Sequence, residues 1–235
     1  HELLGHPNPC RAAPVRELLA KTRRAYARRG MTPAKKEALT REPLQAMLAT
    51  CDDTLRGVRD RALLLFAWAS GGRRRSEVVR ATIENTVRTS EGFLYTLAHS
   101  KTNQSGAQRA DDQKPIVGTA AQALDAWLAA SGIRQGPIFR RVRRGDVIGE
   151  PLAAAAVRDI VQERCRLAGL EGDFSAHSLR SGFVTEAGRR NVPLGDTMAM
   201  TGHASVATVM GYFRAGAAAR SPAARLLDEP EAGDL

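Results

Sequence analysis

The sequence predicts a mainly α-helical fold with one small antiparallel β-sheet, which places it in the α+β class. Apolar residues recur at helical spacing in most long segments, and three short runs of β-type residues, separated by turn residues, lie in the middle of the chain. With 235 residues, the chain is long enough for one domain with a sizeable core plus part of a second.

The N-terminal part of the chain has a composition that separates it from the main domain. Residues 14–30 are predicted to form a basic helix, and residues 31–40 (MTPAKKEALT) resemble a linker. We therefore expect residues 1–40 to hold the end of a helical domain and a linker. Residues 41–214 would form the main domain, and residues 215–235 a tail.

The elements predicted for the main domain follow one another with short connections. Leu63, Leu64 and Phe66, for example, share the spacing of an apolar helix face. In chain order, the predicted helices are residues 42–50, 55–70, 119–130, 151–168, 175–189, 194–200 and 206–213, and the predicted strands are residues 83–87, 93–98 and 114–117.

Charge and cysteine content narrow the class of function. A net charge of +10 and a pI of about 10.3 are typical of a nucleic-acid binder. Aromatic residues make up only 5 %, which argues against a protein that stacks single-stranded bases. The three cysteines are scattered without a CxxC pair, which argues against a disulfide framework or a zinc ribbon. No apolar run is long enough to span a membrane, and no signal peptide is recognised. We expect a cytoplasmic protein.

One stretch near the C-terminus combines residues suited to phosphate chemistry. A spacing of three puts His177 and Arg180 on one helix face. Gly202 has the character of a helix end, followed by His203, and a second short helix would carry Tyr212. Arginine forms bidentate hydrogen bonds with phosphate, and tyrosine can act as a covalent nucleophile. Together these residues predict chemistry on a phosphodiester.

The motifs HSLR and TGHASVATVMGYFR resemble the second half of the active site of tyrosine recombinases, the phage integrase family. That family has His-x-x-Arg, then Gly-His, then Tyr nine residues after the second His, and His203 and Tyr212 have this separation. The resemblance implies the tyrosine recombinase catalytic-domain fold. It also implies that residues 1–40 are the C-terminal remnant of a helical core-binding domain plus a linker.

Residues 70–77 (SGGRRRSE) resemble the first arginine box of the same family, in which the catalytic Arg lies two residues before Ser. That register selects Arg74. The flanking positions are usually apolar in the family but are Arg73 and Arg75 here, so a register slip of one residue stays open. Glu77 is expected to orient an arginine.

The sequence HSKT at residues 99–102 resembles the family's Ser/Thr-Lys-Thr hairpin turn, whose Lys protonates the leaving oxygen. Lys101 matches that position, and Lys114 is the alternative.

The resemblance implies a mechanism without metal or nucleotide. Tyr212 would attack the phosphorus with His177 as base, giving a 3′-phosphotyrosine, while arginines and His203 stabilise the charge. The sequence contains no P-loop, HExxH motif or dense carboxylate cluster, and we expect no cofactor. The expected catalytic residues are Arg74, Lys101, His177, Arg180, His203 and Tyr212.

By resemblance, the protein is a site-specific DNA recombinase that acts on double-stranded DNA as a synaptic tetramer and is associated with the nucleoid of a bacterium or encoded by a phage. Phage integration, transposition, cassette capture and dimer resolution all stay open as its role. One alternative is a type IB topoisomerase-like enzyme, which religates the same strand. Another is a DNA-binding protein with a silent site.

The tail carries the signals of a short helix. Ser221 can cap it, Pro222 suits its first position and Pro230 ends it. So short a helix needs a groove in which to bury Leu226 and Leu227. By resemblance, this tail docks on a neighbouring subunit in a cyclic assembly, and docking on its own domain is the alternative.

Overall fold

The computed structural model describes four stretches of the chain: residues 7–31, 37–97, 112–203 and 205–217. The chain forms two units, residues 1–35 and residues 36–235. The first unit holds a 3₁₀ turn at Pro9–Arg11 and the helix α1 (Ala13–Arg28), which has no buried residue. No helix among the described residues is both long and apolar enough to cross a membrane.

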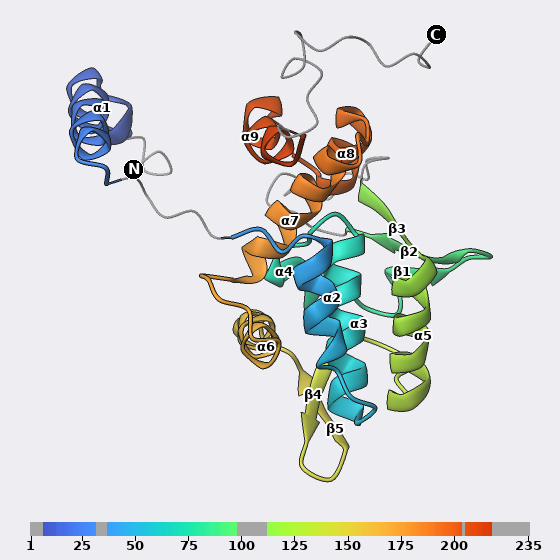
Figure 1. The fold of residues 1–235 in the computed structure, drawn as a ribbon. Helices are drawn as coiled ribbons and strands as arrows, with labels where there is room; N and C mark the ends of the chain where they lie inside the picture. Colours follow the sequence, from blue (N-terminus) through green and yellow to red (C-terminus); the bar gives the residue numbers. More distant parts are fainter. Residues whose placement is uncertain (1–6, 32–36, 98–111, 204, 218–235) are drawn as a thin grey trace, which may run out of the picture. The chain divides into compact units, whose positions relative to one another are not determined.

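Helices dominate the second unit, as the sequence predicted (Figure 1). Leu39 and Thr40, which we assigned to the linker, are buried in this unit. Its described helices are α2 (Arg41–Ala49), α3 (Leu55–Ala69), α4 (Arg75–Val78), α5 (Gly118–Ser131), α6 (Ala154–Leu167), α7 (Ala176–Arg189), α8 (Leu194–Thr201) and α9 (Val206–Ala217).

A three-stranded antiparallel sheet lies between α4 and α5 in the chain and confirms the predicted sheet. Its strands are β1 (Thr86–Arg88), β2 (Gly92–Thr96) and β3 (Gln113–Val117), in the order β1-β2-β3. The first strand starts later than expected, because Thr82 and Asn85 bond each other's backbone in a turn.

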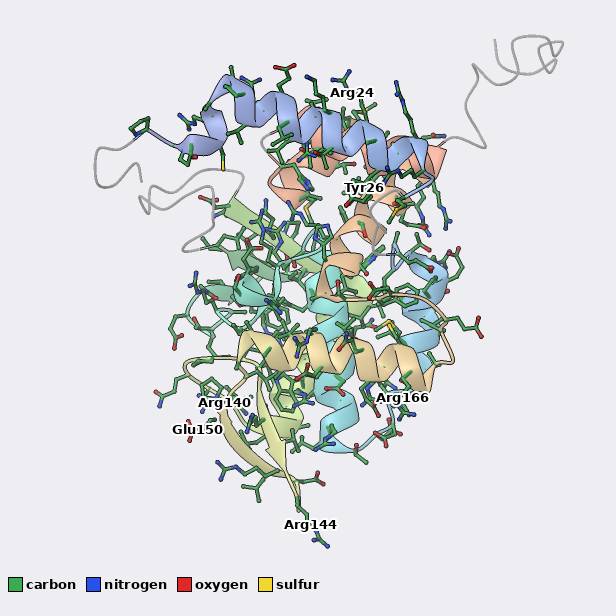
Figure 2. The ribbon with its side chains drawn as sticks, turned by 90° about the vertical axis from the view of Figure 1, so that its left-hand side faces the viewer. Arg24, Tyr26, Arg140, Arg144, Glu150 and Arg166 are labelled. Carbon is green, nitrogen blue, oxygen red and sulfur yellow. The ribbon has the colours of Figure 1, made fainter. Side chains whose placement is uncertain are left out.

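A second, two-stranded sheet corrects the expectation of a single one. It is the antiparallel hairpin of β4 (Arg140–Arg143) and β5 (Val147–Pro151), and it delays the start of α6 to Ala154. Figure 2 shows Arg144 at the outer end of this hairpin, with Arg140 and Glu150 nearer its base. Among the residues of β4 only Val142 is fully buried, so arginines hide the alternation that marks a strand.

Helix α3 forms the centre of the core and packs against α5, α7 and β3. Its Leu63, Leu64 and Phe66 are completely buried. The Phe66 ring lies 4.9 Å from that of Tyr95 on β2, measured between centroids. The sheet and the C-terminal helices are thereby fixed around one helix, whose end leads directly into the first arginine box.

A buried ion network joins α3 to α6. Asp60 accepts two hydrogen bonds from Arg164, at 2.9 and 2.7 Å, and its other oxygen lies 2.6 Å from a nitrogen of Arg59. Arg164 also donates to the Thr50 carbonyl at the end of α2, at 2.6 Å. All three charged side chains are buried, so each needs its partners.

Candidate active site

The first two turns of α7 carry the His-x-x-Arg pair. The Ser175 hydroxyl accepts a hydrogen bond from the His177 backbone at 3.2 Å, and the Ser178 hydroxyl accepts one from the Ser175 backbone at 3.0 Å. These bonds fix the helix start. His177 is exposed, while Arg180, one turn further, is buried. The pair therefore lies along one helix face, with the imidazole outermost.

The backbone of the first arginine box lies in close contact with α7 at Gly72. Gly72 has a φ of +68°, and a Cβ added to it would lie 2.2 Å from the Cα of Arg180. Arg180 also donates from NH1 to the Gly72 carbonyl at 3.4 Å. Only glycine suits both the backbone conformation and this close approach. The contact brings the box and the His-x-x-Arg pair to the same place.

The two candidate arginines of the box have different environments. Arg74 stands just before α4, and its side chain is 39 % exposed while bonding Glu77 at 3.0 Å. Arg73 is only 2 % exposed, and its Nη2 donates to the Met200 carbonyl at 2.6 Å. Glu77 is itself buried and forms ion pairs with both Arg73 and Arg74, as expected from the sequence.

His203 follows α8, which Gly202 ends at a φ of +67°. Arg180 Nε donates to His203 Nε2 at 3.2 Å, and His203 Nδ1 lies 2.7 Å from the Thr201 hydroxyl. Because Nε2 is an acceptor, the ring proton is assigned to Nδ1. Burial, and then the charge of Arg180, lowers the pKa of His203 to about 4, so this imidazole is neutral at pH 7.

Tyr212 reaches the site on α9, which crosses α7 closely. A Cβ on Gly188 would lie 2.2 Å from the Phe213 carbonyl oxygen. The Tyr212 side chain is half-buried, and its ring lies 6.4 Å from that of His177, measured between centroids and edge to face. Burial and the charge of Arg180 lower the pKa of His177. The phenol thus has a neutral imidazole beside it at pH 7.

A cationic pocket of about 330 Å³ lies between α4, α6 and α7. Two buried nitrogens of its arginines, Arg180 Nη2 and Arg73 Nε, have no hydrogen-bond partner among the described residues. Burial, with the charges of Arg73 and Arg74, lowers the pKa of Arg180 to about 10, which still leaves it protonated at pH 7. The titratable side chains that line the pocket are Arg73, Arg74, Arg75, Arg158, His177 and Arg180.

The structure brings five of the six predicted residues into one region, and the sixth, Lys101, lies outside the described residues. The alternative, Lys114, is buried on β3 and donates from Nζ to the Ala199 carbonyl of α8. Sequence reasoning missed Arg158 of α6, which lines the pocket although no motif marks it. Among the described residues, no three His, Cys, Asp or Glu side chains gather as metal ligands would.

Two curated proteins that are similar in sequence to this chain are both named as recombinases. The chain is 35 % identical over 219 residues to an integrase/recombinase xerD homolog of Selenomonas ruminantium, covering 90 % of this chain and 63 % of that protein. It is 27 % identical over 161 residues to tyrosine recombinase XerC of Pelotomaculum thermopropionicum, covering 66 % and 49 %. The chain therefore spans less than two thirds of the length of either relative.

Solved structures share the fold. XerH site-specific recombinase bound to palindromic difH substrate, in a post-cleavage complex, gives a TM-score of 0.62 at 18 % identity over 83 % of this chain and 54 % of that one. A lambda integrase dimer bound to a COC′ core site gives 0.58 at 17 % identity, over 86 % and 58 %. The profile described as the Phage integrase family matches residues 37–218. With that match over most of its length, the chain belongs to the phage integrase family.

Proposed function

We propose that the chain is the catalytic part of a site-specific recombinase that cuts and rejoins double-stranded DNA through a covalent phosphotyrosine. The observation that carries the proposal is the convergence of five side chains from four segments on one cationic region: Arg74, His177, Arg180, His203 and Tyr212. A backbone phosphodiester is an anion that fits such a region, and its non-bridging oxygens accept forked hydrogen bonds from arginine.

In the cutting step, the phenolic oxygen of Tyr212 attacks phosphorus, and the bond from phosphorus to the 5′ oxygen breaks. The phenolic proton passes to His177, whose lowered pKa leaves it neutral and able to accept. Lys101 protonates the departing 5′ oxygen. The products are a 3′-phosphotyrosine and a free 5′ hydroxyl. The 5′ hydroxyl of another strand reverses the step and joins the strands, so the scheme needs neither a metal ion nor ATP.

The transition state gathers negative charge on the non-bridging oxygens. Arg180 has a buried NH2 group without a partner among the described residues, and Arg74 holds an exposed guanidinium at the pocket. Each preorganised donor of this kind stabilises a transition state by about 3–4 kcal/mol. The exposure of Arg74 supports the register in which it, rather than Arg73, contacts phosphate.

His203 changes its role when the phosphate arrives. In the free protein its Nε2 accepts from Arg180, so it cannot donate to an oxygen anion. A bound phosphate draws the Arg180 donors to its own oxygens and favours protonation of the neighbouring imidazole. His203 then donates from Nε2 to a non-bridging oxygen.

Assembly completes the proposal. Residues 36–214 are the catalytic domain, residues 1–35 bring the end of a core-binding domain and a linker, and residues 215–235 dock on a neighbouring subunit of a DNA-bound tetramer in the cytoplasm. The relative described as a lambda integrase dimer on a core site supports assembly on DNA. Deleting residues 220–235 should spare DNA binding and weaken synapsis; unchanged synapsis would remove the tail from the assembly.

The test is capture of the covalent adduct. The protein is expressed in bacteria, cells are lysed in denaturant, and DNA that stays attached to protein is recovered and sequenced. Duplexes with the recovered sequence are then cut in vitro in excess EDTA without ATP. We expect adducts from the wild-type chain and none from Tyr212→Phe. Equal adducts from both, or cutting that requires added magnesium, would contradict the mechanism.

Reactions with the same duplexes distinguish a recombinase from the two alternative functions. A recombinase joins a cut strand to a second duplex, whereas a type IB topoisomerase-like enzyme relaxes supercoils and reseals the same strand. A silent DNA-binding protein shifts the duplex in a gel but gives no adduct. Membership of the phage integrase family favours the first outcome.

A further inference from the structure

Two buried cations hold the C-terminal end of α8. Lys114 Nζ donates to the Ala199 carbonyl, and Arg73 Nη2 donates to the Met200 carbonyl at 2.6 Å. The last carbonyls of a helix have no partner within the helix and carry the negative end of its dipole. Both cations therefore satisfy and neutralise the helix end that directly precedes Gly202 and His203.

Arg73 connects this helix end to the first arginine box, 127 residues earlier in the chain. Its NH1 lies 3.7 Å from Glu77, the carboxylate that also holds Arg74. The box backbone touches the same place, because a Cβ on Gly71 would lie 2.3 Å from the Met200 carbonyl oxygen. Arg73 thus spans the two halves of the site.

Burying this arginine is costly for the fold. Only 2 % of it is exposed, its Nε has no hydrogen-bond partner among the described residues, and its ion pair with Glu77 is long, at 3.7 Å. A well-packed apolar side chain of similar volume would avoid that desolvation cost. What an apolar side chain cannot do is fix the position of the Met200 carbonyl.

We propose that Arg73 is a positioning residue, which holds the end of α8 so that His203 faces the reacting phosphate beside Arg180. This inference rests on the proposed function. Arg73 acts through the Met200 carbonyl and not by contact with the substrate. Loss of the bond leaves Gly202, with its left-handed backbone, free to change the direction in which His203 points.

The direct alternative is that Arg73, which also lines the pocket, contacts a phosphate oxygen. The substitution His203→Ala separates the two roles, since a residue that acts only through His203 has nothing left to position in that variant. Removing a direct arginine contact should slow the His203→Ala protein further. Removing a residue that only positions His203 should not.

The experiment measures single-turnover cutting of a synthetic duplex with the recovered sequence, in the wild-type and His203→Ala backgrounds. Arg73→Met should slow cutting by the wild-type protein on the order of 10- to 100-fold, with unchanged DNA affinity, and should slow the His203→Ala protein no further. Arg74→Met, which removes a direct contact, should slow both proteins. Arg73→Lys, which keeps a donor for the Met200 carbonyl, should restore part of the rate.

Arg164→Met is the matched control, because Arg164 is also buried and also donates to a carbonyl at a helix end, that of Thr50. It should lower the melting temperature without changing the cutting rate of the folded protein. If Arg73→Met does not fold, Arg73→Lys takes its place, and it should slow cutting in the wild-type background and not in the His203→Ala background.

Two results would overturn the inference. One is cutting at the wild-type rate by Arg73→Met, or by Arg73→Lys where it is used instead; the other is a further loss of rate when that substitution is added to His203→Ala. Failure of the wild-type chain to cut the duplex would instead contradict the proposed function.

Discussion

Arg180 Nε donates a hydrogen bond to His203 Nε2 at 3.2 Å, joining α7 to the loop after α8. The same guanidinium donates to the Gly72 carbonyl at 3.4 Å. Arg180 is therefore the centre to which the first arginine box and the Gly-His loop are both attached.

Arg180→Lys should cut DNA about 10²- to 10³-fold more slowly, although the charge is kept. A single ammonium cannot bond Gly72, His203 and a phosphate in the forked geometry of a guanidinium. Single-turnover cutting measures the loss, with Arg88→Lys as control, since Arg88 lies on β1 in an exposed pair with Asp125. A rate near that of the wild type would remove Arg180 from the site.

Folding stability should fall as the pH is lowered from about 6.5, the ordinary pKa of histidine, toward 4. Burial and the facing charges of Arg180, Arg74, Arg73 and His177 lower the pKa of His203 to about 4 in the folded state. Between these values the unfolded chain binds more protons, so acid favours unfolding. Urea denaturation of the wild type and of His203→Asn checks this. The variant should lose less stability over the interval, and an equal loss in both proteins would contradict the assigned pKa.

Asp60→Ala should destabilise the protein by about 3–5 kcal/mol, because it leaves Arg59 and Arg164 buried without their shared carboxylate. The exposed pair of Glu163 and Arg166 provides the control, and Glu163→Ala should cost less than about 1 kcal/mol. Denaturant unfolding measures both. Similar small losses would mean that the buried network does not support α6.

Gly72→Ala should destabilise the fold and impair cutting. Its Cβ would lie 2.2 Å from Arg180, and its positive φ adds strain. Gly118→Ala is the matched control, with a φ of +57° and nothing within 4 Å of the added Cβ. It should cost only the backbone term of roughly 1–2 kcal/mol. Equal stability and equal cutting rates for the two variants would show that the arginine box does not contact α7 closely at Gly72.

The sequence predicted the parts of the molecule that are governed by local patterns. The helices around Leu63 and Arg180 were predicted from the spacing of their residues, and Gly202 marked the end of α8. The β4–β5 hairpin was missed because its strands are rich in arginine, with Val142 alone fully buried on β4.

Tertiary contacts decided what the sequence could not predict about the site. Arg73 belongs to a charged run that resembles a solvated turn, and only the approach of α8 makes it a buried partner of Met200. Arg158 reaches the pocket because α6 packs against α4, a contact between distant parts of the chain.

The most direct test of the account is to locate the covalent bond to DNA. The adduct is digested with nuclease and trypsin, and the peptide of residues 191–214, in which Tyr212 is the single tyrosine, is analysed by mass spectrometry. The account predicts a nucleotide attached through its 3′ phosphate to Tyr212, and a 5′ hydroxyl on the released strand. A nucleotide on any other residue, or a 5′ linkage, would contradict it.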